Sequence, residues 1–98
     1  MITVVRTYTI QKGKQQEAIA CATKAAAHAN VTYPGQARVV RNINGPANQL
    51  HYVMDWESLA TWEASVAEGK DDVQLMALFG ELGALCENQT LNLYKTVS

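Results

Sequence analysis

The sequence is poor in the residues that mark specialised small proteins. Its 98 residues include two cysteines, two prolines, two tryptophans, two histidines and one phenylalanine. Cys21 and Cys86 lie far apart and form no Cys-x-x-Cys or Cys/His cluster, so we predict neither a disulfide nor a metal site. We expect two reduced, buried thiols, because free cysteine behaves as a small apolar residue.

Charge is also scarce, and the two signs are balanced. Charged residues make up 17% of the chain, the net charge is -1 and the isoelectric point is near 6.0. Lys and Arg are scattered, so no basic surface for nucleic acid or anionic membrane is expected. No apolar run approaches about 18 residues, and no leader-like segment opens the chain. We therefore predict a cytoplasmic protein with neither a membrane nor a nucleic-acid partner.

Strand-like and helix-like segments alternate along the chain. Four segments are predicted strands: 2–10, 37–43 and 50–56 by their β-branched and aromatic residues, and 87–96 by its alternation of apolar and polar residues. Three segments rich in helix formers are predicted helices: 14–30, 59–68 and 71–85. Ser58 is placed to cap the second helix and Gly69 to end it.

The order of these elements specifies the fold class, α+β. A β-α-β-β-α-β order, with the second helix in two pieces, is that of a ferredoxin-like plait. Right-handed crossovers place the first and third strands at the centre of a four-stranded antiparallel sheet, with the helices on one face. We predict one domain, residues 1–98, since the chain is too short for a second core.

The predicted sheet has apolar side chains on both sides. The third strand alternates Tyr52 and Met54 on one side with His51 and Val53 on the other, and the first strand carries Val5 opposite Val4. We expect the face without helices to pack against a second copy, giving a homodimeric α+β barrel. The alternative is a monomer with a few exposed apolar residues.

Two stretches resemble a known family. "RTYTIQKGK", residues 6–14, is similar to the opening of NIPSNAP-type domains, and "DWESLATWEASVAEG", residues 55–69, is similar to their strand-to-helix corner. The resemblance implies the dimeric α+β barrel superfamily. That superfamily contains cofactor-free monooxygenases of antibiotic biosynthesis, haem-degrading monooxygenases and small-molecule isomerases. NIPSNAP domains themselves have no settled chemistry.

The resemblance to the haem-degrading group stops at the corner. Trp56-Glu57-Ser58 and the following Trp62 are similar to its pattern, but Ser65 stands where its functional tryptophan lies. The last helix also has no histidine to ligate haem iron. We predict no haem and no other cofactor.

Arg6 is the most informative single residue. It lies on the dominant apolar side of a predicted central strand, where a cation needs a partner. One interpretation is an ion pair with Asp55, Glu57 or Glu87. The other is a clamp for a carboxylate or enolate oxygen, which the planar guanidinium suits.

The alanine-rich first helix suggests a candidate pocket. Its small side chains could leave a volume between helix and sheet, with Arg6, Tyr8, His51 and Trp62 at its border. Each also has a structural interpretation: Tyr8 and Trp62 as core residues, and His51 as a strand histidine. Leu59, Trp62 and Val66 keep the spacing of a buried helical stripe, and the large residues of the last helix could fill the volume.

Two functions therefore stay open. The first is a small-molecule-binding barrel, with a cofactor-free monooxygenase or isomerase acting on a hydrophobic substrate as its catalytic version. The alternative is a non-catalytic dimerisation or interaction module with a packed interior. RNA binding is disfavoured because the third strand lacks the basic-Gly-aromatic run of RNA-recognition motifs.

Overall fold

The computed structural model describes residues 1–98 and has a four-stranded antiparallel sheet as its base. The strands are β1 (Ile2–Ile10), β2 (Gln36–Arg41), β3 (Gln49–Trp56) and β4 (Cys86–Lys95), in the order β2-β3-β1-β4. β1 and β3 are central, as predicted. The ferredoxin-like plait is thereby confirmed.

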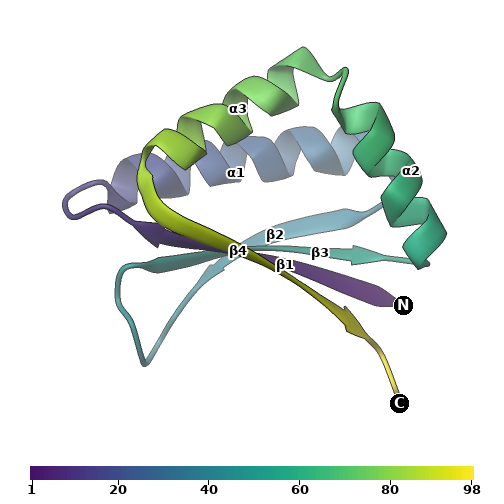
Figure 1. Ribbon diagram of the computed structural model, residues 1–98, viewed down its shortest axis with the longest axis horizontal. Coiled ribbons are helices and arrows are strands. Elements are labelled where there is room, and N and C mark those ends of the chain that lie inside the picture. The colour runs from purple at the N-terminus through teal and green to yellow at the C-terminus, as the bar shows by residue number, and fades with distance from the viewer.

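The three helices of the chain cover one face of this sheet (Figure 1). They are α1 (Gln15–Thr32), α2 (Leu59–Gly69) and α3 (Val73–Ala84). The predicted cap of α2 is confirmed, because Ser58 Oγ accepts a hydrogen bond from the Thr61 N–H at 3.1 Å. Asp72 caps α3 in the same way, so this helix starts two residues later than predicted. None of the three helices combines the length and apolarity needed to span a membrane.

The second strand is shorter than the predicted range 37–43. It ends at Arg41 because the next residue, Asn42, belongs to the turn: its side-chain amide donates to the Pro46 carbonyl at 2.7 Å. Gly45 in the same turn has a φ of 78°, which glycine adopts without strain. The β2–β3 connection is thus held by its own side chains.

The core is tightest beneath α1. Ala18, Ala22 and Ala25 are fully buried and lie over Tyr8 and Leu50. Because alanine has no side chain beyond Cβ, the helix can lie close to the sheet, and the larger side chains of the strands fill the layer between. Leu82 of α3 completes this closed core.

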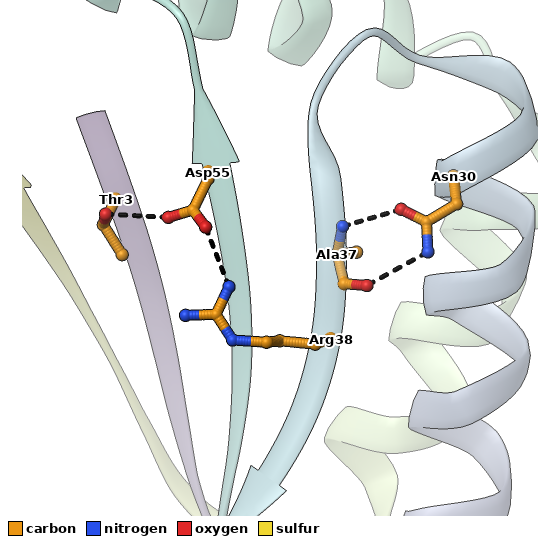
Figure 2. Close-up of polar contacts among 5 residues, drawn as sticks. All are labelled: Thr3, Asn30, Ala37, Arg38 and Asp55. Atoms are coloured by element: carbon orange, nitrogen blue, oxygen red, sulfur yellow. Dashed lines mark hydrogen bonds and ion pairs between the residues drawn. The ribbon is translucent and has the colours of Figure 1, made fainter. Parts of the chain in front are cut away.

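Side-chain alternation assigns Thr3 and Asp55 to the other face, which has no helices. Thr3 and Asp55 are opposite each other in the β1–β3 ladder. Figure 2 shows the Asp55 carboxylate accepting hydrogen bonds from the Thr3 hydroxyl and from Arg38 Nη1, each at 2.8 Å. These contacts join three strands, and they lower the pKa of Asp55, Arg38 having the larger effect.

The outer edge of β2 is protected by α1. The Asn30 side chain accepts from the Ala37 N–H at 2.7 Å and donates to the Ala37 carbonyl at 3.0 Å (Figure 2). The amide thus takes the place of a neighbouring strand at this position. Unpaired strand edges are sites of unwanted association, so this contact reduces that hazard.

Candidate functional site

A cavity of about 90 Å³ lies between the sheet and the helices, at the end of the molecule where β3 passes into α2. Its floor is formed by side chains of the two central strands: Val4, Arg6, Tyr52, Met54 and Trp56. The C-terminal end of α1, the inner side of α2 and the first half of α3 form its walls. Eleven of the 14 lining residues are hydrophobic, so the site suits a mainly apolar ligand. Its volume is below the roughly 300–1,000 Å³ of pockets for drug-sized molecules, so it has room only for a small molecule.

The cavity exists because α2 does not pack on the sheet. The predicted buried stripe of Leu59, Trp62 and Val66 is wrong: Leu59 and Val66 are exposed and Trp62 is half-buried. The only buried residue of the helix is Gly69. Trp62 and Val66 face the cavity, so the apolar side of α2 covers a void and not packed side chains.

Arg6 projects into this cavity without a carboxylate partner. The expected ion pair with Asp55, Glu57 or Glu87 is wrong, because none of the ion pairs in the structure includes Arg6. Asp55 is directed to the opposite face of the sheet, where Arg38 and Thr3 occupy it. Arg6 instead has its guanidinium carbon 5.5 Å from the ring centroid of Phe79, a cation–π distance.

Two further polar groups of the floor are buried without a partner. They are the hydroxyl of Tyr52 and the indole Nε1–H of Trp56, neither of which makes a hydrogen bond. The Tyr52 ring packs edge-on against Phe79, with centroids 5.4 Å apart. Burial raises the pKa of Tyr52 above its ordinary value, so the phenol stays protonated at neutral pH. Buried polar groups are nearly always paired, which makes these two exceptional.

Trp56 owes its position to a close approach of the backbone. A Cβ added at Gly35 would lie 2.7–2.9 Å from three atoms of the indole ring, so only glycine leaves room for it. Gly35 lies just before β2. The Pro34-Gly35 turn therefore acts as a support for one side of the cavity.

A hydrogen-bonded cluster ties α1 to the start of α3 at this end of the molecule. The Asp72 carboxylate accepts from the Tyr33 hydroxyl at 2.6 Å, from His28 Nε2 at 2.7 Å and from the Leu75 N–H at 3.0 Å. These bonds hold the pKa of Asp72 at about 2. The Tyr33 hydroxyl, bonded to that carboxylate, has its pKa raised to about 12. Tyr33 lines the cavity, so the cluster fixes part of its wall.

The structure separates the four predicted pocket residues. Arg6 and Trp62 both line the cavity. Tyr8 is on the same side of the sheet but lies in the closed core under α1, where burial raises its pKa to about 12. His51 lies on the face without helices, because it is opposite Thr7 in the β1–β3 ladder.

The hydrogen bonds of His51 are those of a structural residue. Asn42 Oδ1, 2.6 Å from Nε2, is an acceptor, so Nε2 carries the proton. Nδ1 then accepts from the Thr7 hydroxyl at 2.9 Å. Both ring nitrogens are occupied within the protein, so neither is free to remove a proton from a ligand.

Four cavity residues were not predicted from the sequence: Tyr33, Tyr52, Trp56 and Phe79. For Tyr52 and Trp56 a signal existed, since side chains alternate along β3 and the pairing of Arg6 with Tyr52 puts all three on one face. Tyr33 and Phe79 gave no such signal, because their positions depend on how the helices cross the sheet.

The chemistry available to the cavity is limited. Its lining includes no His, Asp, Glu, Cys or Lys, so it offers no conventional general base. Its two tyrosines, Tyr33 and Tyr52, are both held in the protonated form. No group of three His, Cys, Asp or Glu side chains is placed to bind a metal ion. The arrangement can bind and orient a small molecule, and its polar groups are mainly donors.

The protein has the ferredoxin-like fold that NIPSNAP domain proteins and monooxygenase-like proteins share. No family model matches the sequence, and no curated protein matches it. An uncharacterised NIPSNAP domain protein from Burkholderia xenovorans superposes with a TM-score of 0.84 at 18% identity, over 100% of this chain and 96% of that one. A NIPSNAP family protein of unknown function from Agrobacterium tumefaciens has a TM-score of 0.82 at 16% identity, with coverages of 98% and 87%.

A third similar structure has a described activity. It is a mutant of SnoaB, a cofactor-independent oxygenase from Streptomyces nogalater, with a TM-score of 0.77 at 17% identity and coverages of 99% and 93%. The NIPSNAP resemblance noted in residues 6–14 and 55–69 is thus matched by the fold. At these identities the comparisons establish the shared fold alone.

Proposed function

We propose that the protein binds a small, mainly apolar molecule in the cavity beneath α2. The observation that supports this most directly is the unfilled, apolar space between Trp62 and the sheet. The rest of the interior is closely packed, as the fully buried alanines of α1 illustrate. A helix that covers a void at only one end of a small protein is better explained by a ligand than by a packing requirement.

The alternative of an interaction module with a packed interior fits this cavity less well. Binding, in turn, is better supported than catalysis. Isomerisation by proton transfer and oxygenation through a substrate carbanion both need a group that removes a proton from the substrate, and the cavity lining offers no general base. A cofactor-free monooxygenase, suggested by the similarity to SnoaB, would need a substrate that ionises readily by itself.

Filling the cavity tests the proposal. Ser65 on α2 lines the cavity, whereas its neighbour Ala64 is exposed. Ser65→Phe should abolish binding of neutral aromatic fragments such as fluorotoluene, followed by fluorine NMR, and Ala64→Phe should leave it unchanged. Equal binding to both variants, or no binding to the parent protein, would contradict the proposal.

We also propose that the face without helices joins a second copy of the chain into a barrel. Val40 and Tyr94 are exposed on this face, since they are opposite His51 and Thr3 in the ladders. Val40→Glu should weaken the dimer at least about tenfold in sedimentation, because it buries an unpaired charge. Val31→Glu, at an exposed position of α1, is the matched control. A monomeric parent protein would refute this part.

We propose a cytoplasmic location because neither cysteine forms a disulfide. Cys21 and Cys86 are both free, and each thiol donates a hydrogen bond to a helix carbonyl. Such thiols suit a reducing compartment. Cell fractionation of the tagged protein checks this, and recovery outside the cytoplasm would contradict it.

A further inference from the structure

The polar groups of the cavity floor carry hydrogen-bond donors that have no acceptor. The Arg6 guanidinium makes no ion pair or side-chain hydrogen bond within the protein, and the Tyr52 hydroxyl and Trp56 Nε1–H have no partner. Arginine and tryptophan side chains can only donate, and a tyrosine hydroxyl donates readily. A ligand that completes this site must therefore supply acceptors.

The charge of the site has the same implication. Arg6 is the only ionisable residue with a permanent charge among the 14 that line the cavity, and no carboxylate lies within ion-pairing distance of it. A half-buried guanidinium beside an aromatic ring is partly desolvated, which is costly without a counter-charge. An anionic ligand would supply that counter-charge.

The positions of Arg6 and Tyr52 define where such an anion would bind. The two residues are directly opposite each other in the β1–β3 ladder, and Phe79 contacts both from above. A guanidinium binds a carboxylate through two parallel hydrogen bonds. Burial keeps the Tyr52 hydroxyl protonated, so it can donate a further bond.

We propose that the ligand is a small monocarboxylate with a flat apolar body, held by Arg6 and Tyr52 at its charged end. This proposal rests on the proposed function of the cavity as a ligand site. The flat body follows from the aromatic side chains that line the space, among them Phe79 and Trp62. The cavity volume of about 90 Å³ limits that body to about one ring, and the flexible Met54 and Met76 can adjust to its shape.

Sodium benzoate is the probe, with benzamide as its neutral isostere and toluene as the apolar control. Calorimetry on the full chain should show benzoate binding at least about tenfold more tightly than benzamide. Arg6→Met should weaken benzoate about 10- to 100-fold, the range for loss of a charge-assisted hydrogen bond, and leave toluene within about twofold. Tyr52→Phe should weaken benzoate about 2- to 10-fold.

The indole N–H resonance of Trp56 reports whether benzoate binds in the cavity. This resonance is assigned with the variant Trp56→Phe. This resonance should shift on adding benzoate to the parent protein. Toluene binding also shows that each variant is folded, and the comparison of benzoate with benzamide needs no variant.

The outcomes separate the two proposals. Equal affinity for benzoate and benzamide, or unchanged benzoate binding by Arg6→Met, would overturn the carboxylate inference and leave the apolar ligand site standing. Absence of binding by all three probes, with no shift of the Trp56 resonance, would overturn both.

Discussion

The two ends of the helix layer differ in how they meet the same sheet. At one end, α1 lies on Tyr8 and Leu50 through alanines that are fully buried. At the other, α2 extends over Trp56 with its own apolar residues half-buried or exposed. The first end is a core, closed by complementary small and large side chains. The second is a cavity with unpaired donors, and the contrast locates the site.

The comparison also shows that an apolar helical stripe is not by itself a core stripe. α1 and α2 both present apolar residues towards the sheet, but only those of α1 are buried. α2 is a short helix that follows directly from the end of β3, so it leaves the sheet at the corner and spans the gap towards α3. The following predictions test whether the two ends respond differently to substitution.

The largest effect is expected at the closed end. Leu82→Ala removes a fully buried side chain and should lower the free energy of unfolding by about 2–5 kcal/mol. Met76→Ala at the cavity end removes a side chain that is 41% exposed and should cost less than about 1 kcal/mol, since much of it is already solvated. Urea denaturation measures both, and similar losses would contradict the distinction.

The second largest loss of stability is expected where Gly35 makes room for the Trp56 ring. Gly35→Ala places a methyl group less than 3 Å from the indole ring, so the ring or the turn must move, at a cost of about 1–3 kcal/mol. Gly80→Ala is the control, because its Cβ would meet nothing within 4 Å and alanine favours the helix. That variant should gain about 0.4–1 kcal/mol. Equal stability of the two variants would show that Trp56 is not tightly held.

A smaller effect on stability is expected when acid protonates Asp72 at the cavity end. The pKa of Asp72 is about 2 in the folded chain and higher in the unfolded one, so its contribution to stability is present above pH about 4. It is lost as the pH falls towards about 2. Asp72→Asn should be less stable than the parent at neutral pH, and the difference should shrink in acid.

Asp71→Asn is the control for this titration, because Asp71 is exposed and makes no side-chain hydrogen bond or ion pair. Thermal melts across pH 2–7 measure both variants. A constant difference between the parent and Asp72→Asn at every pH would show that the cluster around Asp72 does not depend on its charge.

The smallest effect on stability is expected from Ser65→Phe. A phenyl ring at this position enters a space that is empty, so it should change the free energy of unfolding by less than about 1 kcal/mol. The same enlargement at the closed end, Ala22→Phe, should destabilise the chain by about 3 kcal/mol or more, because that site is fully packed. A large loss of unfolding free energy in Ser65→Phe would contradict the presence of an empty space at this position.

Most of the fold could be predicted from local chemistry. The order of strands and helices, the Ser58 cap and the central position of β1 and β3 follow from propensity, capping and crossover handedness. The site was predicted only in outline. Arg6 was singled out because a cation on an apolar strand face needs a partner, but the absence of a protein partner required the positions of Asp55 and Arg38.

The relative positions of His51 and Trp62 could not be predicted from the sequence. Both lie in one short stretch, yet they face opposite sides of the sheet, because side chains alternate along a strand and a helix then reverses the direction of the chain. Both were predicted to border one pocket between the first helix and the sheet, but the β1–β3 register directs His51 to the other face.

The sequence by itself determined the secondary structure, the ferredoxin-like order of elements and the presence of a cation on the helix-covered face, since these depend on residues close along the chain. Only the tertiary structure decided that the space under α1 is filled and the space under α2 is not. That outcome depends on side-chain volumes contributed by five separate segments, β1, β3 and the three helices. It also depends on a single close approach, that of Gly35 to Trp56, which no local pattern encodes.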